Sequence, residues 1–192
     1  MLTQRGELIN ELRELDVRNE VLLFVAEVKP ALIVDIDYEE TELLKTHFPF
    51  TPLESELSEV IYANMFFQSE EQKEKFVKEN MNGYFIKSRT RLGIELGYPP
   101  DACKVFGRNL RLTDVAEKEY FKLFNEKGYA NHPWVEERAI ELGFNENTTI
   151  IDYHGMRFNT PIDKIKESCI WMVDNRPVPE NLQTQVMMKK FV

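Results

Sequence analysis

The sequence contains only two cysteines, Cys103 and Cys169, and they are far from the C-x-x-C spacing of a redox or metal motif. A secreted chain of this kind more often carries a disulfide framework, so we expect two reduced thiols and a cytoplasmic protein. Long apolar runs are also absent, since no stretch approaches the roughly 18 residues that a membrane span needs. Residues 3–7 are polar and do not resemble a signal peptide. We therefore expect neither a transmembrane helix nor a secretory leader.

Complete catalytic motifs are missing as well. The sequence has no complete phosphate-binding loop, activated nucleophile or cluster of metal ligands. Cys103, Cys169, His132 and His154 do not have the spacing of a zinc site, so no metal is expected there. These absences favour a cytosolic, non-catalytic binding or regulatory protein without a cofactor.

The net charge of −9 comes entirely from the N-terminal part of the chain. Residues 1–59 contain fourteen acidic and five basic side chains, whereas residues 60–192 contain nineteen of each. A run of like charge can be no more than a solvated face of the fold. The alternative, which we adopt as the prediction, is that the acidic N-terminal part binds a protein partner of unknown identity.

The sign of the charge reverses between residues 87 and 111. Only Glu95 and Asp101 oppose six basic residues in this stretch, which are Lys87, Arg89, Arg91, Lys104, Arg108 and Arg111. We predict an anion-binding site at Lys87, Arg89, Arg91 and Arg108. The alternative is that this stretch is only a solvated surface of the fold, with a charge opposite to that of the acidic N-terminal part. Aromatic side chains lie nearby, but a protein of net negative charge is repelled by a phosphate backbone, so nucleic-acid binding is not expected.

Hydrophobic patterning predicts an α/β or α+β fold, in which a small mixed sheet of about three to four strands packs with many helices. The predicted strands are residues 31–37, 58–68 and 149–153. We divide the chain into an acidic α/β segment (1–68), a helical segment (69–147) and a strand-turn-helix segment (148–192), all within one compact domain. Helices are predicted over residues 7–15, 21–26, 41–47, 69–80, 85–96, 101–106, 114–127, 134–142 and from 160 onward.

Helix boundaries are marked by short local signals. Ser69 and Gln72 form a capping box, in which each side chain satisfies a backbone N–H at the start of a helix. Four glycine-aromatic pairs, at Gly83, Gly97, Gly128 and Gly143, are typical of helix ends, where glycine takes the left-handed conformation. Thr113 is predicted to cap a separate helix beginning at residue 114.

Asp35 and Asp37 follow an apolar run and are one residue apart. On a strand, alternate side chains point the same way, so the two carboxylates could hold Mg²⁺ against a phosphate. The arrangement resembles the haloacid-dehalogenase-like hydrolases, in which D-x-D closes the first strand. That resemblance implies an Mg²⁺-dependent phosphate-ester hydrolase with Asp35 as nucleophile and Asp37 as acid/base, and it would require Asp174 as the later acidic residue. Residues 38–41 (YEET) depart from the Gly-Thr of that family.

Asp152 and His154 form a second pair at strand spacing, with Arg157 close in sequence. Histidine titrates near neutral pH, so this pair could act as an acid and a base. The alternative is that the two residues only form part of the exposed face of a β-hairpin and have no role in catalysis.

Residues 96–99 read L-G-Y-P. This string resembles the mark of an uncharacterised prokaryotic family, found mainly in archaea, in which paired cysteines follow the motif. Asp101 and Ala102 occupy the places of those cysteines here, and Cys103 falls one position late. The resemblance implies an intracellular α/β protein, and no metal or redox role is transferred to this chain.

Overall fold

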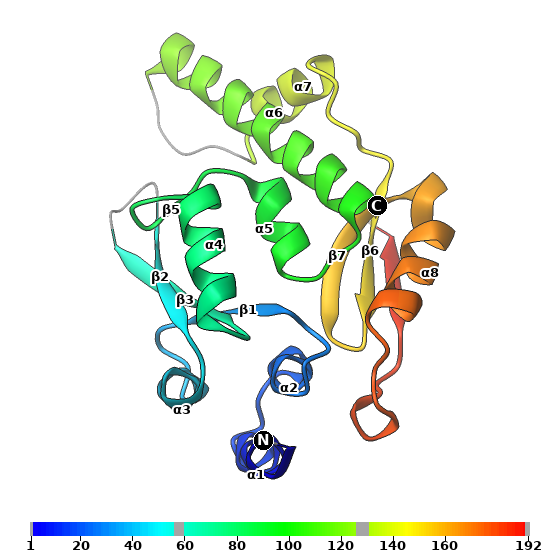
Figure 1. The fold of residues 1–192 in the computed structure, drawn as a ribbon. Helices are drawn as coiled ribbons and strands as arrows, with labels where there is room; N and C mark the ends of the chain where they lie inside the picture. The colour runs from blue at the N-terminus through cyan, green and yellow to red at the C-terminus, as the bar shows by residue number, and fades with distance from the viewer. Residues whose placement is uncertain (1, 56–59, 126–130, 191–192) are drawn as a thin grey trace.

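The computed structural model describes residues 2–55, 60–125 and 131–190. Helices and strands are mixed, as predicted, and the strands form three small antiparallel sheets in the order β1-β3-β2, β4-β5 and β7-β6-β8 (Figure 1). The helices are α1 (Leu2–Glu14), α2 (Asn19–Val25), α3 (Glu40–His47), α4 (Glu70–Asn80), α5 (Arg89–Glu95), α6 (Pro100–Phe124), α7 (Pro133–Glu141) and α8 (Ile165–Asn175), with 3-10 turns at Ile162–Lys164 and Glu180–Leu182. The strands are β1 (Ala31–Asp35), β2 (Phe50–Glu54), β3 (Ile61–Phe67), β4 (Met81–Asn82), β5 (Phe85–Ile86), β6 (Thr148–Tyr153), β7 (Met156–Pro161) and β8 (Met187–Lys190).

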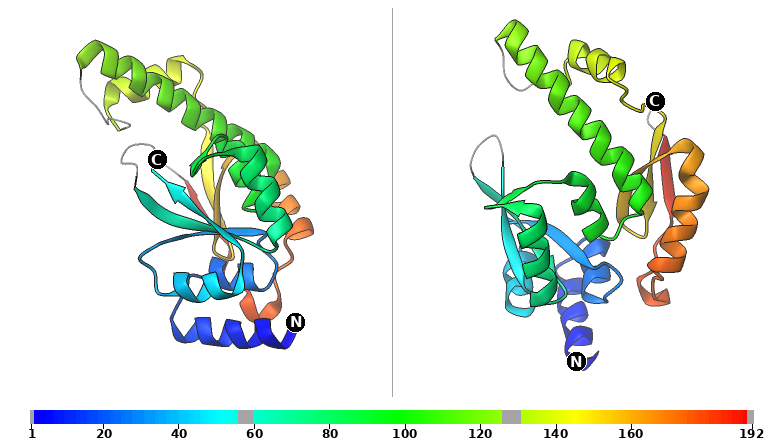
Figure 2. Two further views of the ribbon diagram at one scale, coloured as in Figure 1. Left: turned by 60° about the vertical axis from the view of Figure 1, so that its left-hand side comes forward. Right: turned by 45° about the horizontal axis from the view of Figure 1, so that its top comes forward.

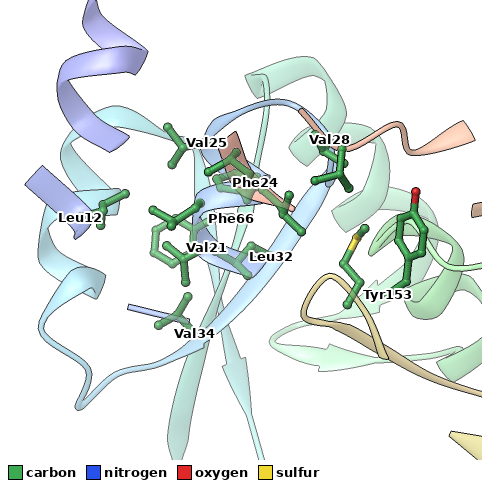
Figure 3. Packing of buried hydrophobic residues seen from close by; sticks show 14 of the residues in the cluster. Leu12, Val21, Phe24, Val25, Val28, Leu32, Val34, Phe66 and Tyr153 are labelled. Carbon is green, nitrogen blue, oxygen red and sulfur yellow. The ribbon is translucent and has the colours of Figure 1, made fainter. Parts of the chain in front are cut away.

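The first sheet is covered by helices on both faces. Leu32, Val34 and Phe66 pack with α1 and α2 on one face, where Leu12 and Phe24 complete the cluster (Figure 3). The alternate residues of β1 and β3 face the other way and pack against α4 and α5. A strand that is buried on both faces needs a continuous apolar run, which explains why residues 31–34 do not alternate with polar ones.

The prediction that residues 149–153 join the same sheet as residues 31–37 is wrong. β6 pairs with β7 and β8 in a separate sheet. β2 and β8 were not predicted, and β2 contains Pro52, which an edge strand tolerates. Hydrophobic patterning identifies a strand, but it does not specify the partner with which that strand pairs.

α6 is one continuous helix of 25 residues, so the predicted boundary at Thr113 is wrong. The Thr113 hydroxyl donates to the backbone oxygen of Asn109, one turn back, which allows a threonine inside a helix. The first half of α6 contacts α5 and β7, and the second half packs with α7 beyond the two larger sheets (Figure 2). No helix in the described parts of the chain is long and apolar enough to cross a membrane.

Close packing between α5 and α6 depends on two glycines. A Cβ atom on Gly107 would lie 2.1 Å from the Thr90 hydroxyl oxygen, and one on Gly93 would lie 2.7 Å from the Cys103 sulfur. Side chains at either position would push the helices apart. This contact aligns the basic residues of the two helices along one groove.

Most of the predicted boundary signals are confirmed. Ser69 caps α4, since its hydroxyl accepts from the backbone N–H of Gln72 at 3.2 Å. Gly97 and Gly143 have positive φ angles at the ends of α5 and α7. Gly83 also has a positive φ angle, but it lies in the tight turn between β4 and β5, so its assignment to a helix end and the helical assignment of residues 85–88 are wrong. Gly128 lies outside the described residues.

Candidate functional site

Asp35 and Asp37 do not share a strand. β1 ends at Asp35, and Asp37 lies in the turn that follows, so the aligned pair expected from the D-x-D spacing is not formed. Both residues are exposed. The Thr41 hydroxyl donates to the backbone oxygen of Asp35 at 2.8 Å and holds this turn against the start of α3.

Asp152 and His154 stabilise the β6–β7 hairpin. The Asp152 carboxylate is largely buried, with one oxygen accepting from the Gly155 backbone N–H at 2.7 Å and the other from Arg157 Nε at 2.8 Å. His154 has a positive φ angle, and its Nδ1 accepts from the backbone N–H of Thr184 at 2.9 Å. Both side chains therefore have structural partners in the turn and in the segment before β8.

The four predicted catalytic residues do not meet. Within residues 2–55, 60–125 and 131–190, no three His, Cys, Asp or Glu side chains lie close enough together to hold a metal ion. Asp35, Asp37, Asp152 and His154 also line neither of the two pockets described below. The structure thus brings three of the four predicted anion-binding residues to one cavity, but none of the predicted catalytic ones.

A groove of about 740 Å³ lies between α5 with its preceding loop and the first half of α6. Three of the four predicted anion-binding residues, Lys87, Arg89 and Arg108, line it, whereas Arg91 does not. Lys104 and Arg111 add two further cations. We call this the basic groove; its lining residues are Ile86, Lys87, Ser88, Arg89, Thr90, Leu92, Lys104, Phe106, Gly107, Arg108, Leu110, Arg111 and Asp114.

The helical repeat places the α6 cations together. Lys104, Arg108 and Arg111 are spaced four and three residues apart, so they share one face of the helix. Lys104 forms an exposed ion pair with Asp101 at 2.8 Å, and its hydrogen bond and charge lower the pKa of that carboxyl. Among the described residues, Arg108 and Arg111 have no salt bridge, and Asp114 is the one acidic side chain that lines the groove. The groove is therefore strongly electropositive within an acidic protein.

An apolar pocket of about 190 Å³ adjoins the basic groove. Arg89, Leu92 and Phe106 line both cavities, so the two adjoin at the α5–α6 contact. The far wall of the apolar pocket comes from the β6–β7 hairpin, through Ile150 and Phe158 among others. Its complete lining is Arg89, Leu92, Gly93, Leu96, Tyr98, Ala102, Cys103, Phe106, Ile150, Arg157, Phe158 and Asn159.

Tyr98 of the L-G-Y-P string also lines the apolar pocket, and its side chain is held by contacts on both sides. Its ring lies 5.8 Å from that of Phe158, and its hydroxyl accepts from Lys29 Nζ at 3.3 Å. Pro99 and Pro100 follow and begin α6, where a proline needs no backbone donor. The motif therefore ends α5, begins α6 and fixes one side of the apolar pocket.

Cys103 lies in the apolar pocket, and burial raises the pKa of its thiol to about 12. Because the thiolate is the reactive form, we expect Cys103 in the folded protein at pH 8 to react with a disulfide reagent at least a hundredfold more slowly than in urea. The folded pKa lies above the ordinary value of 9.0, so the associated stability is complete below pH 9 and is lost as the pH rises towards 12. The rate at which Cys103 reacts with the disulfide reagent can be measured in a Cys169→Ala variant, in which Cys103 is the one remaining thiol. Equal reaction rates with and without urea would contradict the prediction.

Sequence reasoning missed the apolar pocket and two cations of the groove. Ile150, Phe158 and Asn159 are more than 25 residues away in sequence from the end of α6, so no local pattern connects them with it. Lys104 and Arg111 could have been added to the predicted site by their helical spacing. The prediction ended the helix at residue 106, which left Arg108 and Arg111 outside it and concealed that spacing.

Comparison with known proteins adds no functional assignment. The resemblance of the L-G-Y-P string to a prokaryotic family accordingly stays a prediction. No protein-family model, curated protein or solved structure matches this chain.

Proposed function

We propose that this protein is a binding protein that takes a small anionic ligand in the basic groove. The observation that carries the proposal is the presence of five cationic side chains around one groove of about 740 Å³, a size within the usual range of ligand pockets. A cavity lined by charge of one sign focuses the electrostatic potential and attracts ions of the opposite sign. Guanidinium groups are also well suited to phosphate and carboxylate, because they donate two parallel hydrogen bonds.

The two other hypotheses from the sequence have less support. Mg²⁺-dependent hydrolysis by Asp35 and Asp37 would need carboxylates aligned in a cleft, and these two are exposed at a strand end and in a turn. Binding of a protein partner by the acidic N-terminal part stays a prediction. Cytoplasmic location likewise stays a prediction.

Removing one groove cation should weaken anion binding. We expect Arg108→Gln to raise the Kd for pyrophosphate at least tenfold in low-salt buffer, because a charge-assisted hydrogen bond is lost. Isothermal titration calorimetry of the intact protein measures this directly. Binding by the unaltered protein should also weaken as salt is added, since exposed charges are screened.

Lys118→Gln is the matched control, because Lys118 is an exposed cation on the same helix that does not line the groove. It changes the net charge by the same amount, and we expect its Kd to stay within about twofold of the unaltered protein. Equal weakening by both substitutions would mean that net charge alone governs binding. Either that result or the absence of pyrophosphate binding at low salt would overturn the proposal.

A further inference from the structure

We infer that the anionic ligand carries a single aromatic ring, and that this ring occupies the apolar pocket while the anion lies in the basic groove. The ligand class is thus an aryl phosphate or a similar ring-bearing anion. This inference rests on the proposed function and specifies the chemistry of the same site.

The adjacency of the two cavities is the first argument. Arg89, Leu92 and Phe106 line both of them. One molecule can therefore place a charged group among the cations and an apolar group between α5, α6 and the β6–β7 hairpin. A purely inorganic anion would leave the apolar pocket unfilled.

The size and lining of the apolar pocket indicate a ring. Its volume of about 190 Å³ is slightly larger than the roughly 150 Å³ of an engineered apolar cavity that binds benzene. Three aromatic side chains, Tyr98, Phe106 and Phe158, contribute to its walls. Aromatic rings pack favourably against one another in offset or edge-to-face arrangements, so a flat ring fits this lining better than a flexible chain.

A series of three ligands tests the inference on the full-length protein. Methyl phosphate supplies the anion alone, phenyl phosphate adds the ring, and n-hexyl phosphate replaces the ring by a chain. We expect phenyl phosphate to bind about tenfold more tightly than methyl phosphate, because the ring leaves water for an apolar site. n-Hexyl phosphate should bind more weakly than phenyl phosphate.

Two variants test whether the ring occupies the apolar pocket. Ala102→Leu fills the pocket from α6 and should remove the advantage of phenyl over methyl phosphate while leaving methyl phosphate binding unchanged. Because Ala102 is buried, Ile150→Phe, on the half-buried wall of β6, is a second pocket-filling variant.

The outcomes distinguish this inference from the proposed function. Equal affinity for methyl and phenyl phosphate, both weakened by Arg108→Gln, would overturn the inference and leave the anion site in place. A hexyl phosphate that binds as tightly as phenyl phosphate would also overturn it. Binding of none of the three phosphates would overturn the proposed function and, with it, the inference.

Discussion

Replacing Glu20 by glutamine is expected to lower the free energy of unfolding by about 3 kcal/mol. Lys29 is 1% exposed, and its Nζ donates to Glu20 Oε2 at 2.7 Å and to the Tyr98 hydroxyl at 3.3 Å. Removing the carboxylate charge leaves a buried ammonium without an ionic partner. Glutamine keeps an acceptor oxygen, which places the loss at the lower end of the range of about 3–5 kcal/mol for broken buried pairs. Urea unfolding of both proteins measures the difference.

Arg18 provides the control for this prediction, because it contacts the other oxygen of the same carboxylate at 2.9 Å from an exposed position. Arg18→Gln should cost less than about 1 kcal/mol, as exposed ion pairs do. The double variant Glu20→Gln/Lys29→Met, which removes both buried charges, should recover much of the loss. Similar losses for Glu20→Gln and Arg18→Gln would contradict the assignment of Lys29 as the buried partner that matters.

The same ion pair sets a pH dependence at the alkaline end. Burial by itself lowers the pKa of Lys29, but its interactions with Tyr98 and Glu20 outweigh burial and raise the pKa above its ordinary value of 10.5. A raised pKa means that the stabilisation is complete below pH 10.5 and is lost as the pH rises through the folded-state value. The slope of stability against pH above 10.5 should therefore be smaller in Lys29→Met than in the unaltered protein.

Gly97→Ala is expected to destabilise the protein by about 2–5 kcal/mol, as the sum of backbone strain and steric overlap. The φ angle of Gly97 is +90°, which residues with a Cβ atom rarely adopt. The added Cβ would lie 2.6 Å from Cδ of Pro30 and 2.9 Å from Nε of Arg176. The Pro30 ring cannot move away easily, and Arg176 is held by its hydrogen bond to the Gly97 backbone oxygen. Chemical denaturation of the variant and of the unaltered protein measures this difference in the free energy of unfolding.

Gly83→Ala separates the two causes. Gly83 has a φ angle of +60°, and a Cβ atom there would meet no other atom within 4 Å. Only the strain remains, so its loss should be about 1–2 kcal/mol. If Gly83→Ala and Gly97→Ala cost the same, the contacts with Pro30 and Arg176 would not contribute, and the packing argument for the L-G-Y-P string would be wrong.

The predictions that the structure confirms depend on short-range signals. The Ser69 cap, the glycines that end α5 and α7, and the apolar run of β1 each concern residues within about one or two helical turns or a single strand. Gly83 shows the limit of this reasoning, because a positive φ angle serves a tight turn between strands as well as a helix end. Three of the four residues predicted to bind an anion line one groove for a similar local reason, since they come from one basic stretch of sequence.

The sequence by itself determined the mixed fold class, most helix boundaries and the basic stretch, because capping, backbone conformation and charge are properties of neighbouring residues. Only the tertiary structure decided that β6 belongs to a separate sheet and that Asp152 and His154 lie in a hairpin turn. It also decided that α5, α6 and the β6–β7 hairpin together line an apolar pocket. Those features depend on which distant segments pack together. That choice is made by the total burial and shape of many side chains, and no single stretch of the chain contains it.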